Sequence, residues 1–503
     1  MAILKIYPLA LLIFSLLFST LSQGSESDIE ESAFLIKYKT PELQLRAIKK
    51  MENAKTFLSN STQKVEALTP EWVKISGNPQ NMNRILQMQK KEIEYIQPDF
   101  KINLIEDYQL NNPKERADYL TYLQQNQQIM ASSKYSDNPK ISEALPQKTN
   151  PDPMLASQWG MLDMGGPQVW KQIQTTQMNQ QTPIIVAVID TGVDYTHPDL
   201  NPNMWRNPGE TGLDASGKNK STNKIDDDGN GYIDDVVGYD FLSNDAFPYD
   251  LAVPAWQLLL GGGNPGHGTH CAGNIAARGN NGLGISGVAP NAQIMALRFI
   301  GNRGGTTSAA IKAIKYAVDN GAKILNNSWG SEGENPGEDT ENRALKEIIA
   351  YAEAKGVLFI AAAGNGHAGK GYDNDTDSRP GYPASYKYSN IISVAAIDSE
   401  NNLGGFSNWG KETVHIAAPG VKILSTIVGG SYADKVIPFL ANWEGTSMAA
   451  PHVSGAAALY WSMHPEKTAS EVKEAILASA VKIPSLENKI KSEGKLNLIN
   501  LMK

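Results

Sequence analysis

Three polar residues, far apart in the sequence, have the types and settings needed for nucleophilic catalysis by a hydroxyl group. Asp190 ends a long apolar run, His267 stands among glycines, and Ser447 follows Gly-Thr and precedes a run of small residues. A serine hydroxyl is a poor nucleophile at neutral pH, so it needs a neighbouring base and a carboxylate that orients the base. The chain order Asp, His, Ser is one of the orders known for such a triad.

Each of these residues also has a structural interpretation. Ser447 could cap a core helix, Asp190 could cap another, and His267 could be hydrogen-bonded within its turn. In the first helical turn, however, the hydroxyl of Ser447 would lie among N–H groups that lack internal partners, at the positive end of the helix dipole. That setting suits a nucleophile whose attack creates an oxyanion. The joint occurrence of all three motifs therefore favours catalysis.

Alternating strands and helices are predicted to position these residues. Apolar strands are expected at 183–190, 293–299, 323–326, 357–362 and 391–396, with helices at 308–319, 341–354, 452–463 and 471–480 between or after them. Unbroken apolar strands are typical of buried parallel sheets. The pattern predicts an α/β fold with a doubly wound, mostly parallel sheet, helices on both faces, and active residues at the carboxyl ends of the strands.

On these motifs the sequence resembles the subtilisin family of serine peptidases (subtilases) over residues 152–503. The resemblance implies that Ser447 attacks the scissile carbonyl, that His267 carries its proton to the leaving amine, and that Asp190 orients His267. Asn365, in the segment 361–365, matches the family's oxyanion residue. Its side-chain amide should donate beside the Ser447 backbone N–H.

The resemblance also implies where a substrate binds. Its backbone should add as an edge strand between two segments, and two glycines should line the first specificity pocket. With glycine at both pocket positions, the pocket is expected to be deep and apolar and to favour a large hydrophobic P1 residue. Pro383 matches a cis-proline of the pocket wall. The implied substrate-binding residues are Ser328, Trp329, Gly330, Gly304, Gly305, Gly364 and Gly381, with the Trp329 side chain either narrowing the entrance or belonging to the core.

Two residues near His267 are not given a catalytic role. His270 lies three positions further along the same helix, points elsewhere, and is expected to be structural. Cys271 lies at i+4 from His267 and therefore on its helix face. It resembles the cysteine of the thiol-containing branch of the family.

An acidic stretch between Asp190 and His267 predicts a calcium site. Oxygen ligands alternate around a glycine turn as at the start of an EF-hand loop, but Val237 stands where the closing glutamate is expected. The alternative is a solvated acidic turn. A weaker signal for a second site comes from Asp199 and the Asn280-Asn281 loop. The predicted ligands are Asp226, Asp228, Asn230 and the Tyr232 carbonyl, with Asp234 or Asp235 closing the shell.

Composition limits the classes of protein to be considered. The 503-residue chain is 41% hydrophobic and 19% charged, an ordinary globular composition. Its net charge of −8 argues against nucleic acid as a main partner. Cys271 is the single cysteine, so no internal disulfide can form.

The chain is expected to contain four parts. Residues 1–24 have the features of a signal peptide, and no later apolar run could span a membrane, so a secreted or periplasmic protein is predicted. Residues 33–100 indicate a small α+β unit that resembles the family's inhibitory propeptide. Residues 101–151 are predicted to be a linker, and residues 152–503 the peptidase domain.

The sequence therefore predicts a secreted, calcium-stabilised serine endopeptidase, made as a zymogen that its own propeptide inhibits. Two alternatives stay open. One is a peptidase that processes particular precursors, with the apolar insertion 246–263 and Trp329 conferring selectivity. The other is a non-catalytic binding protein on the same fold.

Overall fold

The computed structural model describes residues 33–55, 64–77, 86–87, 89–104, 151–175, 182–261, 263–334 and 341–503. The predicted signal peptide and residues 105–150 of the predicted linker lie outside this part of the chain. The chain divides into two compact units, Met1–Asp99 and Phe100–Lys503. No helix in the described ranges is long and apolar enough to cross a membrane.

The first unit has the predicted α+β composition. Its antiparallel sheet has the order β2-β3-β1-β4, and one face of helix α2 packs on it through Ala47 and Met51. The sequence pattern missed β2, because its alternating Lys-Val-Glu-Ala segment has little apolar content. The sequence also indicates a helix at 81–91; residues 81–85 and 88 lie outside the described residues, and 86, 87 and 89 are helical. The elements are β1 (Ala33–Tyr38), α2 (Pro41–Lys55), β2 (Lys64–Ala67), β3 (Trp72–Ser76) and β4 (Ile93–Pro98).

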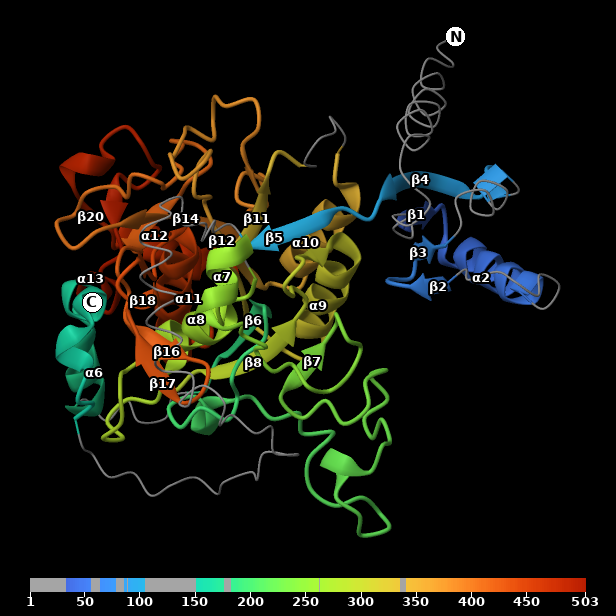
Figure 1. Cartoon of the computed structure of the whole chain (residues 1–503), viewed down its shortest axis with the longest axis horizontal. Helices are drawn as coiled ribbons and strands as arrows, with labels where there is room; N and C mark the ends of the chain where they lie inside the picture. The colour runs from blue at the N-terminus through green and yellow to red at the C-terminus, as the bar shows by residue number, and fades with distance from the viewer. Residues whose placement is uncertain are drawn as a thin grey trace. The chain divides into compact units, whose positions relative to one another are not determined.

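The second unit is built on a nine-stranded sheet with the order β20-β21-β15-β14-β12-β10-β6-β8-β7 (Figure 1). All neighbouring pairs are parallel except β20 and β21. The central strands are buried on both faces, which explains their unbroken apolar runs. The strands are β6 (Ile185–Asp190), β7 (Gly238–Asp240), β8 (Gln293–Arg298), β10 (Ile324–Asn327), β12 (Leu358–Ala362), β14 (Ile391–Ile397), β15 (Ile416–Pro419), β20 (Val481–Lys482) and β21 (Gly494–Lys495).

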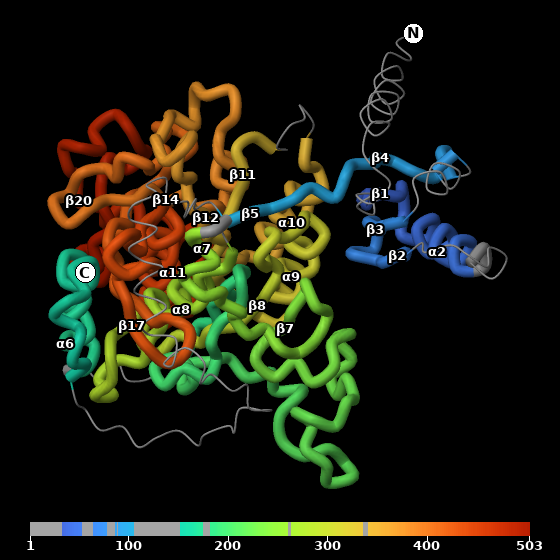
Figure 2. Tube along the Cα trace, in the orientation of Figure 1, coloured from blue at the N-terminus to red at the C-terminus, as the bar shows by residue number. Residues whose placement is uncertain are grey.

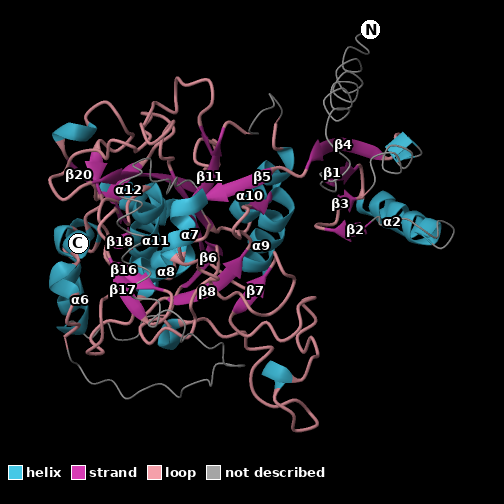
Figure 3. Cartoon of the chain, viewed as in Figure 1, coloured by secondary structure: helices cyan, strands magenta, loops and turns pink. Residues whose placement is uncertain are grey.

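Helices cover both faces of this sheet (Figure 3). Helices α8 and α11 pack together over one face, and the amphipathic helices α9 and α10 pack together over the other. Helix α11 is buried almost all round, and its small residues allow it to lie close to α8 and the sheet. The helices are α5 (Trp159–Asp163), α6 (Gly166–Thr175), α7 (Ala255–Gly261), α8 (His267–Ala276), α9 (Thr307–Asp319), α10 (Arg343–Ala354), α11 (Thr446–Met463), α12 (Ala469–Ala478) and α13 (Leu498–Leu501).

A second, antiparallel sheet of the order β13-β11-β5-β9 lies beside the carboxyl ends of the large sheet. Its strand β5 comes from far earlier in the chain than its neighbours, as the colours of Figure 2 show. Two short hairpins, β16–β17 and β18–β19, precede helix α11. These strands are β5 (Lys101–Leu104), β9 (Gly305–Thr306), β11 (Trp329–Glu332), β13 (Gly381–Tyr382), β16 (Ser425–Ile427), β17 (Ser431–Ala433), β18 (Lys435–Ile437) and β19 (Ala441–Asn442).

Candidate active site

The structure brings Asp190 and His267 together. Asp190 is the last residue of strand β6, and His267 is the first residue of helix α8. The Oδ1 atom of Asp190 lies 2.7 Å from Nδ1 of His267, and both side chains are fully buried. A carboxylate in this position holds the imidazole ring in one orientation and would stabilise it when it becomes protonated.

The amino end of helix α8 is anchored by a residue of the apolar insertion. Buried Asp250 accepts hydrogen bonds from the Thr269 N–H (2.9 Å) and from the side-chain amide of Asn264 (2.6 Å). The Oδ1 atom of Asn264 in turn accepts from the His267 N–H at 3.3 Å. Burial raises the pKa of Asp250. The segment 246–263 thus helps to fix His267, a role that sequence analysis missed because Asp250 has no motif around it.

His270 and Cys271 lie close to the site. His270 bonds the Ile423 carbonyl through Nε2 (3.0 Å) and stacks on Trp443, and burial lowers its pKa to about 3. The structural role expected for it fits these contacts. The Sγ atom of Cys271 lies 3.9 Å from Nδ1 of His267 and 3.5 Å from the Ser447 carbonyl oxygen. Burial raises the pKa of the Cys271 thiol, so this group is neutral packing beneath the histidine.

Ser447 is the second residue of helix α11, which packs against helix α8, and its carbonyl oxygen lies 3.5 Å from Sγ of Cys271 on α8. The helix starts at Thr446, so Ser447 lies in its first turn as predicted, and the helix continues into the helical stretch predicted at 452–463. The Oγ atom of Ser447 donates to the Ser328 carbonyl oxygen at 3.1 Å. That carbonyl follows strand β10, so the hydroxyl lies at the carboxyl edge of the sheet, where Asp190 also ends its strand.

Asn365 follows strand β12 and faces the amino end of helix α11. Its Oδ1 atom accepts two hydrogen bonds from Thr446, one from the N–H (2.9 Å) and one from the hydroxyl (2.8 Å). With the oxygen held in this way, the Nδ2 amide group is directed to the other side, toward the pocket that Asn365 lines. Thr446 is a positioning residue that sequence analysis passed over, although it stands directly before Ser447.

The two predicted substrate-binding segments lead into strands β9 and β11, and a segment of the chain itself lies between these strands. Strand β5 pairs antiparallel with β11 (Asn103 opposite Gly330, Leu104 opposite Trp329) and with β9 (Ile102 opposite Gly305). The Thr307 N–H donates to the Phe100 carbonyl oxygen at 2.9 Å. Residues 101–104, predicted as the start of a linker, are therefore ordered, because both edges supply backbone partners.

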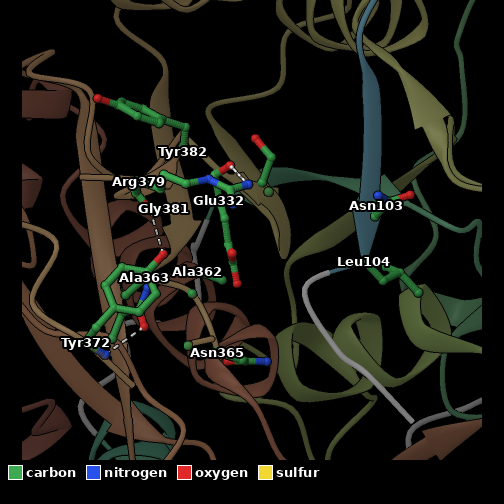
Figure 4. Close-up of a pocket in the computed structure, with 15 residues that line it drawn as sticks. Asn103, Leu104, Glu332, Ala362, Ala363, Asn365, Tyr372, Arg379, Gly381 and Tyr382 are labelled. Atoms are coloured by element: carbon green, nitrogen blue, oxygen red, sulfur yellow. Dashed lines mark hydrogen bonds between the residues drawn. The ribbon is translucent and has the colours of Figure 1, made fainter. Parts of the chain in front are cut away.

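The predicted first specificity pocket is a cavity of about 280 Å³. Gly364 and Gly381 line it as expected, together with Ala362, Ala363 and Gly330. The Tyr382–Pro383 bond in its wall is cis, as the resemblance implied. The glycine and alanine walls are apolar as expected, but the charged residues Glu332 and Arg379 also line the cavity (Figure 4).

Trp329 belongs to the core and does not narrow the pocket entrance. Its side chain is fully buried and packs edge-on against Phe299, with ring centroids 5.0 Å apart. Successive side chains of a strand point to opposite faces, so the neighbours of Trp329 face the cleft while its ring faces the core. Only its backbone, paired with Leu104, takes part in binding the extended segment.

The acidic loop gathers around a buried glutamate that sequence analysis did not include. Ligand atoms of Glu210, Asp226 and Asp228 all lie within 4.8 Å of one another. The Oε2 atom of the fully buried Glu210 has no hydrogen-bond partner. Burial and the nearby charges of Asp235, Asp228 and Asp227 raise the Glu210 pKa to about 7. Such a donor set suits Ca²⁺, which binds carboxylate oxygens.

The other predicted ligands differ in their placement. Asn230 donates to Asp228 and Asp235, and fully buried Asp235 also bonds the hydroxyl of Tyr316 on helix α9. Asp234 instead accepts from the Lys224 N–H and lines a separate surface cavity. Of the two residues proposed to close the shell, Asp235 is therefore the one inside the cluster. Tyr232 lies two positions after Asn230, and the Tyr232 N–H donates to Oδ1 of Asn230 at 2.7 Å.

The weaker second acidic site also gathers oxygen atoms. Asp199 accepts from the Asn281 side chain (2.6 Å) and the Tyr432 hydroxyl (2.9 Å). Asp152 accepts from the N–H groups of Asn280 and Asn281, and burial raises its pKa.

The apolar insertion is partly self-packed. Leu258 and Leu259 of helix α7 form a small core with Ile437 of strand β18, whereas Phe247 and Trp256 stay exposed. The insertion therefore packs through these leucines against the chain's own β18–β19 hairpin.

Comparisons with known proteins agree with this geometry. Residues 181–497 match the model of the subtilase family. The chain is 37% identical over 316 residues to the thermophilic serine proteinase of Bacillus sp. (strain AK1), covering 63% of this chain and 60% of that protein. It is 36% identical over 334 residues to thermitase of Thermoactinomyces vulgaris, covering 66% of this chain and 91% of thermitase.

A solved structure is similar as well. Fervidolysin from Fervidobacterium pennivorans, described as a keratinolytic enzyme related to subtilisin, superposes with a TM-score of 0.62 at 25% identity. The similarity covers 95% of this chain and 62% of fervidolysin. The fold is that of a protein related to subtilisin, and the chain spans about three fifths of the Bacillus proteinase and of fervidolysin. The chain belongs to the subtilase family.

Proposed function

We propose that this protein is a serine endopeptidase whose triad is Asp190, His267 and Ser447. The observation that carries the proposal is the fully buried 2.7 Å pair of Asp190 and His267, set beside the first turn of the helix that bears Ser447. A non-catalytic binding protein would have no need of a buried carboxylate–imidazole pair next to a helix-terminal serine.

In this mechanism the Ser447 hydroxyl leaves the Ser328 carbonyl and attacks the scissile carbon while His267 takes its proton. The oxygen of the substrate carbonyl becomes negatively charged, and it is stabilised by the Ser447 N–H and the Nδ2 amide of Asn365. His267 then gives the proton to the leaving amine, which departs as the acyl-enzyme forms. Water, deprotonated by His267, releases the acyl group by the same steps.

We also propose that the protein is made as a zymogen, exported with the help of residues 1–24, and blocked by its own residues 33–104. Support comes from strand β5, which pairs with both predicted substrate-binding segments, at Gly305 on one side and at Trp329 and Gly330 on the other. An extended peptide held by backbone pairing on two sides is bound as a substrate would be. Cleavage at a bond beyond Leu104, after the position that faces Ser328, would separate the inhibitor from the peptidase.

A calcium ion is proposed to stabilise the acidic loop. Asp226, Asp228 and Asp235 would hold it, together with Asn230 and the Tyr232 carbonyl, and the unpaired Oε2 atom of Glu210 makes Glu210 an additional ligand. The bound ion would neutralise a cluster of carboxylates that is costly to bury without a cation. Since Asp235 also bonds Tyr316 on helix α9, the site would stiffen the helix that follows edge strand β9.

The Glu210→Gln variant is expected to bind Ca²⁺ roughly tenfold or more weakly than the wild type, because it loses one charged oxygen ligand. Asp234→Asn is the matched control, since Asp234 belongs to the same loop but points out of the cluster. Calorimetric titration of chelator-treated protein measures both affinities, and melting curves with and without Ca²⁺ should show a smaller gain for Glu210→Gln. Equal affinities in the two variants would exclude Glu210 as a ligand.

The substrate class is proposed to be unfolded protein or peptide with a large P1 residue. Digestion of a denatured protein mixture, with the cut sites mapped by mass spectrometry, tests this. Cleavage after many large residues supports a general endopeptidase, and cleavage confined to one extended motif supports the processing of particular precursors. No cleavage by the matured protein would refute the proposed activity.

A further inference from the structure

The pocket next to Ser447 has a charged outer wall that the sequence did not predict. Glu332 is the last residue of strand β11 and lies opposite Gly381 in the pairing with β13. Figure 4 shows its side chain running across the pocket toward Ala362 and Asn365 on the other wall. The side chain is 39% exposed, so its carboxylate is accessible to a molecule that enters the pocket.

The carboxylate of Glu332 is held by a histidine from the opposite wall. Nδ1 of His367 lies 2.9 Å from Oε2 of Glu332, and its Nε2 atom lies 3.3 Å from Asp377. The imidazole ring stacks on Tyr372, with centroids 4.0 Å apart. Arg379 is also present, but its guanidinium donates to the backbone carbonyl of Glu332 at 3.3 Å. The partner of the carboxylate is therefore a titratable group rather than a permanent cation.

The strand geometry sets how far a bound side chain must reach. Leu104 pairs with Trp329, so in a peptide bound in this register the position after Leu104 faces Ser328, next to the nucleophile. We take this position as P1. Glu332 is four positions further along, about 13 Å at the usual strand rise. Gly330 lies on the same face as Glu332 and has no side chain to obstruct the path. A long P1 side chain can therefore meet the Glu332 carboxylate, whereas a short one cannot.

We propose that Glu332 is a P1 specificity residue that favours lysine or arginine, and that the His367 imidazolium competes with the substrate for it. This inference rests on the proposed peptidase function. The methylene stem of such a residue contacts the glycine and alanine walls that also accept large apolar residues, and its terminal cation pairs with Glu332.

The competition makes this preference depend on pH. Partial burial alone would lower the pKa of His367, but hydrogen bonds and charges from Glu332 and Asp377 outweigh it and raise the pKa above its usual value. Below that pKa the imidazolium neutralises Glu332. As pH rises through the His367 pKa, His367 loses its proton and the Glu332 carboxylate becomes available to the substrate. The rate for a P1 cation relative to an apolar P1 residue should therefore increase.

Two peptides that differ only in lysine or phenylalanine at P1 test the proposal. The measured quantity is the ratio of kcat/KM for the lysine peptide to that for the phenylalanine peptide, in which effects on the triad cancel. We expect Glu332→Gln to lower this ratio by about fivefold, a modest change because the site is partly exposed and screened. The wild-type ratio should rise between about pH 6 and about pH 9, and His367→Gln should flatten that rise.

Glu334→Gln is the matched control, because it removes the same charge just beyond strand β11 from a residue that pairs with Lys346. Active-site titration with a fluorophosphonate corrects every variant for its folded fraction. If the phenylalanine peptide is cleaved but the lysine-to-phenylalanine ratio of kcat/KM is the same in the wild type, Glu332→Gln and Glu334→Gln, this inference alone is overturned. Absence of turnover of both peptides overturns the peptidase function and this inference with it.

Discussion

The Ser447→Ala variant is expected to lose almost all peptidase activity and to remain uncut between its N-terminal unit and its peptidase unit. Without the hydroxyl no acyl-enzyme can form, and in a subtilisin the loss of the nucleophile costs about 10⁶-fold in kcat. The wild type should instead yield a new N-terminus beyond Leu104, since strand β5 pairs with β9 and β11, the proposed substrate-binding strands. Mass spectrometry of both purified proteins measures this.

Addition of a small amount of wild-type enzyme provides the control for this prediction. If the uncut variant is folded, a trace of wild-type enzyme should cut it at the bond at which the wild type cuts itself. Such a cut would show that the bond is accessible and that the variant lacks only the nucleophile. Processing of Ser447→Ala on its own, in a host without other peptidases of this type, would contradict an autocatalytic maturation.

The Asn365→Ala variant is expected to lower kcat with little effect on KM. Its Oδ1 atom is fixed by two hydrogen bonds from Thr446, which leaves the Nδ2 amide to stabilise charge that develops only during the reaction. In a subtilisin the removal of the corresponding donor costs about 10²–10³ in kcat. Steady-state kinetics on matured protein measures the effect.

Asn365→Asp separates the donor from the shape of the side chain. Aspartate keeps the size of asparagine and can still accept both hydrogen bonds from Thr446, but it has no N–H to donate. It should therefore be at least as inactive as Asn365→Ala while melting at a temperature close to that of the wild type. A kcat within about threefold of the wild type in either variant would remove Asn365 from the oxyanion site.

The parts of the fold that the sequence predicted are those with a periodic apolar signal. Strand β6 reads as an unbroken apolar run because it is buried on both faces, and α10 shows one apolar face because its other side is in solvent. Strand β5 gave no such signal. It is ordered by backbone pairing with β9 and β11, two segments more than two hundred positions away, and backbone pairing leaves little trace in side-chain types.

The residues of the candidate site likewise fall into those that the sequence identified and those that only the structure revealed. Asp190, His267 and Ser447 stand in short motifs whose glycines and small residues are themselves unusual, so they could be found without coordinates. Asp250, Glu210 and Glu332 are single acidic residues in ordinary surroundings. Their positions become informative only when the fold sets them against the Thr269 N–H, the other carboxylates of the acidic loop and His367, respectively.

Reaction of the matured protein with a fluorophosphonate, followed by peptide mapping, tests the assignment of the nucleophile most directly. The reagent phosphonylates a serine only when an adjacent base activates its hydroxyl. We expect a single adduct on Ser447, formed in step with the loss of activity, and far slower labelling of His267→Ala. An active protein that is not labelled, or one that is labelled on a different serine, would contradict the account.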